Sequence, residues 1–92
     1  MSSHFNISIF GRVQGVFFRR TVRHEAHRLG ISGFVGNAPD GSVYIEAEGP
    51  EAVLKGFVTW IRNGAGEGEH SLSQIDVEEG SFKGLQGFEI KD

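Results

Sequence analysis

The order in which strand-like and helix-like segments follow each other limits most strongly how this 92-residue chain can fold. Strand-like segments are typically marked by alternating apolar and polar residues, and here they are Phe5–Phe10, Ser32–Asn37, Val43–Glu48, Ile75–Glu78 and the short Leu85–Ile90. Helix-like segments, in which apolar residues recur every three or four positions, are Phe18–Leu29 and the stretch that Gly49-Pro50 opens and Gly64 ends. The order is therefore β-α-β-β-α-β with a short extra strand.

This order predicts an α+β fold, a ferredoxin-like α/β sandwich. Each helix has a single apolar stripe, so we expect both helices to cover the same face of one antiparallel sheet. Gly30 predicts the end of the first helix, and Pro39-Asp40-Gly41 predicts a tight hairpin turn. Residues 1–92 are expected to form one domain, because the segment rich in glycine, glutamate and serine, Gly64–Ser71, indicates a mobile loop and no domain boundary.

Composition indicates a small folded domain. The chain is 38% hydrophobic, and we expect its eight phenylalanines and Trp60 to form much of the core. It has no cysteine, which excludes disulfides, thiol catalysis and thiolate metal sites. The sequence shows no apolar run of membrane-spanning length and no signal-peptide pattern, so a soluble cytoplasmic protein is expected. Four glutamates are expected on edge strands, where they favour a monomer: Glu46, Glu48, Glu78 and Glu79.

Charge is divided unevenly along the chain. Residues 1–30 contain five arginines and one acidic residue, Glu25, giving a net charge of +4. Residues 31–92 contain four basic and eleven acidic residues, giving −7 and a total of −3. A local positive charge in an acidic protein favours a small anionic ligand. It disfavours an extended contact with nucleic acid, which needs a larger basic surface.

Residues 11–19, Gly-Arg-Val-Gln-Gly-Val-Phe-Phe-Arg, join the first strand to the first helix. Gly11 and Gly15 allow sharp bends that expose backbone N–H groups, and the helix adds the partial positive charge of its N-terminus. Arg19 adds a planar, charged set of donors. Together these features predict an anion-binding loop.

Residues 11–19 are also the first part of a longer sequence signature. The sequence G-x-V-Q-G-V-x-F-R at 11–19, followed by Gly33-Phe-Val-Gly-Asn37 and Asp40-Gly41, resembles the signature of the acylphosphatase family over nearly the whole chain. The resemblance implies the ferredoxin-like fold and the hydrolysis of the carboxyl–phosphate bond of acyl phosphates, without metal or cofactor. The expected partners are a small acyl phosphate and inorganic phosphate, with no nucleic acid and no membrane.

Position by position, the resemblance implies that the phosphate is bound by the backbone N–H groups of Gln14, Gly15, Val16, Phe17 and Phe18 together with Arg19. It implies that Asn37 orients the attacking water. Many members of the family have a serine or threonine after this asparagine, and this chain has Ala38 instead. The missing hydroxyl is expected to affect the fine tuning of the rate more than the activity itself.

Three alternatives have weaker support in the sequence. A non-catalytic module that senses phosphate or acyl phosphate would use the same loop. A nucleic-acid binder with the same fold is opposed by the net negative charge. His24-Glu25-Ala26-His27 has a histidine spacing of three, not the four of a metalloprotease helix, so no metal site is expected.

Overall fold

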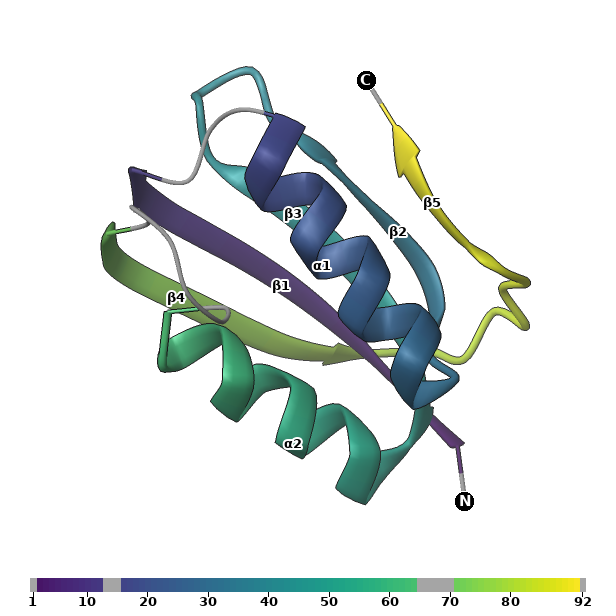
Figure 1. Cartoon of the computed structure of the whole chain (residues 1–92). Coiled ribbons are helices and arrows are strands. Elements are labelled where there is room, and N and C mark those ends of the chain that lie inside the picture. Colours follow the sequence, from purple (N-terminus) through teal and green to yellow (C-terminus); the bar gives the residue numbers. More distant parts are fainter. Residues whose placement is uncertain (1, 13–15, 65–70, 92) are drawn as a thin grey trace.

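The computed structural model describes residues 2–12, 16–64 and 71–91, which form five strands and two helices (Figure 1). In chain order they are β1 (Ser2–Arg12), α1 (Val16–Leu29), β2 (Ser32–Asn37), β3 (Val43–Pro50), α2 (Glu51–Arg62), β4 (Ser71–Gly80) and β5 (Phe88–Lys91). The predicted order is confirmed. The second helix begins one residue after Pro50, so the Gly49-Pro50 pair completes β3 and does not form the first turn of α2.

The strands form one sheet in the order β4-β1-β3-β2-β5. Its first four strands are antiparallel, but β5 pairs with β2 in parallel, so the expected antiparallel sheet is in fact mixed. The register explains the difference. Gly80 at the end of β4 lies opposite His4, which in turn lies opposite Glu48, and Glu48 also pairs with Ser32 at the start of β2. The chain therefore leaves β4 at the end of the sheet where β2 begins, and β5 starts from that same end.

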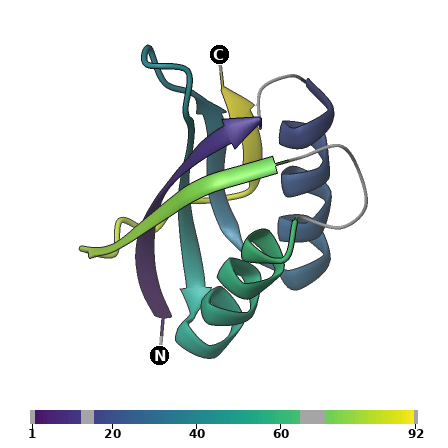
Figure 2. The ribbon, with the colours of Figure 1, turned by 90° about the vertical axis from the view of Figure 1, so that its left-hand side faces the viewer.

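Both helices pack on one face of the sheet, as predicted (Figures 1 and 2). Helix α1 contacts β2 and β5, whereas α2 contacts β3 and β1. Apolar side chains from both helices and from the covered face of the sheet form the core. The fully buried ones with the largest volume include Phe18, Phe57, Phe88, Ile7, Ile9, Ile45, Leu54 and Ile61.

The phenylalanines do not all contribute to this core. Phe17 and Phe82 are 81% and 56% exposed, which corrects the expectation from composition. Neighbouring residues of a helix point about 100° apart, so Phe17 cannot share the core-facing direction of Phe18. Trp60 is only half-buried and stacks on Phe57 with ring centroids 6.0 Å apart.

The two predicted chain reversals are confirmed. Gly30 follows α1 with a φ of +71°, and the N–H of Ile31 donates to the carbonyl of Ala26 at 2.9 Å, which closes the helix end. In the hairpin, the N–H of Gly41 donates to the carbonyl of Ala38 at 3.0 Å. The expected mobile loop Gly64–Ser71 lies, for residues 65–70, outside the described part of the chain.

The face of the sheet that the helices do not cover carries three buried polar residues that we call the open-face cluster: His4, Glu46 and Glu48. A segment that we call the strap, residues 81–87, crosses this face between β4 and β5. Glu48 accepts hydrogen bonds from the backbone N–H groups of Lys83 and Leu85, both at 2.6 Å. Its carboxylate also lies 2.6 Å from Nδ1 of His4. The cluster therefore fixes the strap to the sheet.

These contacts overturn the expectation that Glu46 and Glu48 lie on an edge strand. Both belong to β3, the central strand, while Glu78 and Glu79 do lie on the edge strand β4. The strap was not foreseen, and it is what allows two carboxylates to be buried at the centre of the sheet.

Candidate active site

The fold brings the ends of three secondary-structure elements together at one end of the molecule. Because β1 and β2 are both antiparallel to β3, they run in the same direction, and α1 returns between them. The end of β1, the start of α1 and the end of β2 consequently lie near one another (Figures 1 and 2). The register places Asn37 and Ile9 opposite the same residue, Val43, on either side of β3. This proximity is what the sequence pattern alone could not establish.

Arg19 lies in the first turn of α1, on the flank of the helix that faces β5. Arg19, Arg23 and His27 follow one another at four-residue intervals and so share one side of the helix. Arg23 Nε and His27 Nε2 contact the carbonyl oxygen of Phe88 in β5 at 3.2 and 3.1 Å. Arg19 is half-buried and its Nε atom is buried. The helix thus holds this guanidinium group partly inside the structure, at the end of α1 where the helix begins.

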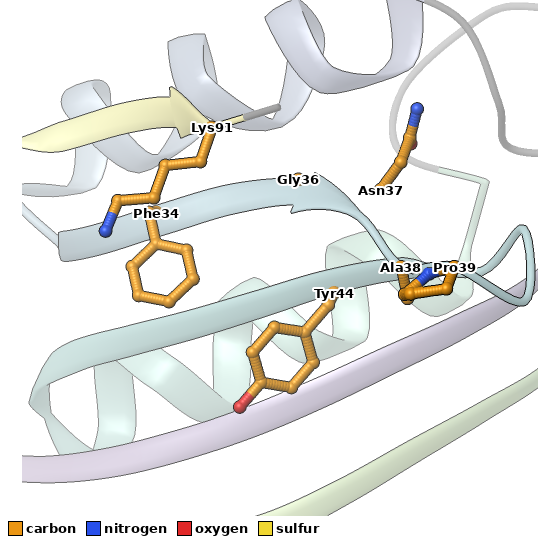
Figure 3. Close-up of a pocket in the computed structure, with 7 residues that line it drawn as sticks. All are labelled: Phe34, Gly36, Asn37, Ala38, Pro39, Tyr44 and Lys91. Atoms are coloured by element: carbon orange, nitrogen blue, oxygen red, sulfur yellow. The ribbon is translucent and has the colours of Figure 1, made fainter.

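Asn37 is the last residue of β2, and its side chain is exposed. It pairs with Val43, whose buried side chain lies on the helix-covered face, and directly paired residues share a face. Figure 3 shows the Asn37 side chain directed away from the rings of Phe34 and Tyr44, which lie on the open face. The amide is therefore placed at the same end as α1 and on the side of the sheet where α1 packs.

The start of α1 has the properties expected of an anion-binding helix end. Its first turn, Val16–Arg19, contains no acidic residue, and its N–H groups point along the axis toward the N-terminal end. The Phe18 side chain is 0% exposed and belongs to the core, so only the backbone of this residue is available to a ligand. Gln14 and Gly15, the other predicted binding residues of the loop, lie outside the described residues.

The structure also has a shallow pocket of about 280 Å³ on the open face, which the sequence did not reveal (Figure 3). It is lined by Phe34, Gly36, Asn37, Ala38, Pro39, Tyr44 and Lys91. The rings of Phe34 and Tyr44 have centroids 6.2 Å apart, and Nζ of Lys91 lies 4.3 Å from the centroid of Phe34. Phe34 was expected in the core with the other phenylalanines, whereas it lies half-buried on the open face, and the register of β5 brings Lys91 to it.

Metal ligands do not gather anywhere in the described parts of the chain: residues 2–12, 16–64 and 71–91 contain no group of three or more histidine, aspartate or glutamate side chains that could hold an ion. His27 of the His24–His27 pair contacts the carbonyl of Phe88 instead. The two described helices are also too short and too polar to cross a membrane.

Known proteins resemble this chain in sequence and in fold. A 38% identical relative, named an acylphosphatase, comes from a Nocardioides strain; the alignment covers 99% of this chain and 90% of the relative. A second acylphosphatase, from Latilactobacillus sakei, is 53% identical over 62 residues, 67% of each chain.

Among solved structures, the crystal structure of acylphosphatase from Bacillus subtilis is similar, with a TM-score of 0.89, 40% identity and full coverage of both chains. The structure of full-length HypF in its phosphate- and nucleotide-bound form contains a region similar to the whole of this chain. That region has a TM-score of 0.87 and 30% identity, and it makes up 12% of HypF. The acylphosphatase family model matches residues 5–90, almost the full length, and the chain therefore belongs to the acylphosphatase family.

Proposed function

We propose that this protein, an acylphosphatase by family, hydrolyses acyl phosphates through in-line attack of a water molecule positioned by Asn37 on a phosphoryl group bound by Arg19 and the residues before it. The products are a carboxylate and inorganic phosphate. The observation that carries this assignment is that the start of α1, whose first turn contains the half-buried Arg19, and the end of β2, which is the exposed Asn37, lie at one end of the molecule.

The proposed phosphate site uses backbone N–H groups of residues 14–18 and the guanidinium group of Arg19. Phosphoryl transfer places most of the developing charge on the three equatorial oxygens, so catalysis depends mainly on positioning and on charge stabilisation. Several N–H groups aligned at a helix N-terminus supply the first, and a planar cation that can hold two oxygens supplies the second. Donors held in place before the reaction lower the reorganisation needed in the transition state, and this supports the assignment of both groups.

Asn37 is proposed to hold the water. Its carboxamide oxygen accepts a hydrogen bond and its NH₂ group donates, so it can orient a water molecule without removing its proton. Holding the water in a fixed orientation lowers the activation barrier, because the entropy of bringing the reactants together is already lost on binding. The phosphate group of the substrate can accept the water proton as the P–O bond to the acyl group breaks. The leaving group is a carboxylate, which needs little protonation.

We further propose that the protein acts as a monomer. Glu78 and Glu79 lie on the edge strand β4, where acidic residues oppose pairing with a second sheet. Sedimentation equilibrium across a range of protein concentrations should give a single species with the mass of one chain, and a dimer mass would contradict this.

Turnover of benzoyl phosphate, followed by absorbance in the presence of EDTA, tests the proposed reaction. We expect hydrolysis that EDTA does not slow and that inorganic phosphate inhibits competitively. Arg19→Ala and Asn37→Ala should both lose activity while keeping the circular dichroism spectrum of the wild type. A folded wild-type protein that binds phosphate but does not turn over would instead support a non-catalytic phosphate-binding module.

A further inference from the structure

We propose that the side chain of Phe17 contacts the acyl group of the substrate, so that the enzyme prefers acyl phosphates with a large apolar acyl group, such as an aromatic one, over small ones. This inference rests on the proposed function, because in-line attack by a water at Asn37 gives the acyl group its direction. The side chain of Phe17 has no other role in the reaction described above.

Phe17 is 81% exposed, more than Phe82, the other exposed large apolar residue in the described part of the chain. A single exposed aromatic ring is common on protein surfaces and by itself indicates nothing. The position of this ring is more informative, since Phe17 belongs to the first turn of α1, the same turn as Arg19. Helical side chains lean toward the N-terminus of their helix. The ring therefore borders the helix end where the phosphate is proposed to bind.

The direction of Phe17 around the helix separates it from the other site residues. Phe17 and Arg19 lie about 200° apart around the helix axis. Phe18, between them, points into the core, and Arg19 shares its flank with Arg23, which contacts β5. Phe17 consequently lies on the flank away from β5 and from the sheet, which agrees with its exposure.

In-line attack fixes the relation between the water and the leaving group. The attacking and leaving oxygens lie on opposite sides of phosphorus. Asn37 belongs to β2 in the sheet, so a water that it holds approaches phosphorus from the side of the sheet. The bond to the acyl group then points away from the sheet, toward the flank of α1 that carries Phe17.

The apolar pocket on the open face is the competing place for the acyl group, because Asn37 also lines it. Its rings, Phe34 and Tyr44, lie on the face of the sheet opposite α1, as Figure 3 shows. An acyl group in this pocket would lie on the water side of phosphorus, which in-line displacement does not allow. The geometry therefore favours Phe17 over Phe34 as the contact of the acyl group.

The experiment compares benzoyl phosphate with acetyl phosphate in the wild type and in Phe17→Ala, which keeps the backbone N–H of this residue. We expect kcat/KM for benzoyl phosphate to fall about threefold to tenfold, the effect of one lost aromatic contact, with the change mainly in KM. Because the backbone N–H of Phe17 is kept, the effect on acetyl phosphate and on inhibition by inorganic phosphate should be clearly smaller than the effect on benzoyl phosphate, so that the ratio of kcat/KM for the two substrates falls. Phe17→Trp should restore the preference for benzoyl phosphate.

Two control variants complete the design. Phe82→Ala removes the other exposed phenylalanine, which lies in the strap, and should leave both substrates unaffected. Phe34→Ala opens the competing pocket. The inference is overturned if Phe17→Ala changes both substrates equally or neither, or if Phe34→Ala alone selectively slows benzoyl phosphate. Failure of the folded wild type to hydrolyse either substrate would overturn the proposed function first and this inference with it.

Discussion

The open-face cluster and the proposed active site place their polar groups in opposite settings. In the cluster, Glu48 is 2% exposed, and its carboxylate is hydrogen-bonded to two backbone N–H groups and to His4. At the proposed active site, Asn37 is exposed and Arg19 only half-buried. Groups whose hydrogen bonds are completed inside the protein stabilise the fold, whereas groups that face solvent remain available to a ligand. The comparison predicts that substitutions in the two regions act on different measurable quantities.

Arg19→Lys should give the largest effect, a loss of about 10²-fold or more in kcat/KM for benzoyl phosphate. An ammonium group keeps the charge but cannot hold two phosphate oxygens in one plane. Steady-state kinetics measures the loss, with Arg20→Lys, the exposed neighbour, as the matched control that should stay near wild type. Near-normal turnover of Arg19→Lys in a folded protein would show that Arg19 does not bind the phosphate as proposed.

Asn37→Ala should lower kcat by about 10²-fold, on the scale of one lost positioning group. The proposal assigns phosphate binding to other residues, so the inhibition constant of inorganic phosphate should change little. Measuring both quantities on one preparation separates water positioning from substrate binding. A large rise in that inhibition constant would show that Asn37 binds the phosphate instead.

Glu48→Gln should act on stability and leave turnover at wild-type level. A glutamine has one acceptor oxygen, while the carboxylate of Glu48 accepts from Lys83, Leu85 and His4. At least one buried donor would then face an NH₂ group, at a cost of about 2 kcal/mol. Urea unfolding followed by circular dichroism measures this cost. Glu89→Gln, an exposed change on β5, is the control and should shift the free energy of unfolding by less than about 0.5 kcal/mol.

Stability should also fall in acid because of the same cluster. Burial alone would raise the pKa of Glu48, but the N–H of Lys83, His4 and the N–H of Leu85 together hold it below its ordinary value of 4.5. The pKa of Glu46 is likewise lowered: burial opposes ionisation, and Lys83, Tyr44 and His4 outweigh it. A carboxyl group with a lowered pKa in the folded state stabilises the fold fully above its ordinary pKa and loses that contribution as the pH falls below it.

The free energy of unfolding should therefore decrease as the pH falls below about 4.5, and the decrease should be smaller in Glu48→Gln. Urea titrations at a series of pH values, in both proteins, measure the two slopes. Equal slopes would show that Glu48 does not contribute to acid sensitivity.

Lys83→Ala should give the smallest effect. Its Nζ contacts Glu46 at 2.9 Å, but the lysine side chain is 55% exposed, and ion pairs of this kind contribute about 0.5 kcal/mol or less. The backbone N–H of Lys83, which binds Glu48, stays in place. Thermal unfolding in low and high salt measures the contribution. A loss as large as that of Glu48→Gln would contradict the distinction between side-chain and backbone contacts of the strap.

The elements and the site residues were predictable from the sequence to different degrees. The apolar stripe of α1 and the limits of β2 follow from local pattern, and both are confirmed. Arg19 was predicted from the loop pattern and from the family signature, and the role of Asn37 from the family signature alone. That the elements carrying them meet at one end of the sheet depends on the register between β1, β3 and β2, which no local pattern encodes.

The strap shows why the remainder could not be predicted. Alternation along β3 indicates that Glu46 and Glu48 point to the face opposite the apolar residues of this strand, as they do. A residue on that face is exposed only if no other segment covers it. The covering segment, residues 81–87, includes residues 85–87, which the sequence pattern assigned to the last strand, whereas that strand begins only at Phe88. The path of this segment over the sheet is set by tertiary contacts with Glu48. The parallel pairing of β5 follows from that path.

The contact of Arg23 and His27 with the carbonyl of Phe88 has a consequence for the order in which the described elements can assemble. Arg19 lies one helical turn from Arg23, so the flank of α1 that carries the proposed phosphate-binding arginine is held by β5, which follows all the other described elements in the chain. Until residues 88–91 pair with β2, β2 lacks its outer neighbour and α1 lacks this anchor. The hairpin of β2 and β3 can therefore form before β5 docks, whereas the flank of α1 that carries Arg19 gains its anchor only when β5 is in place.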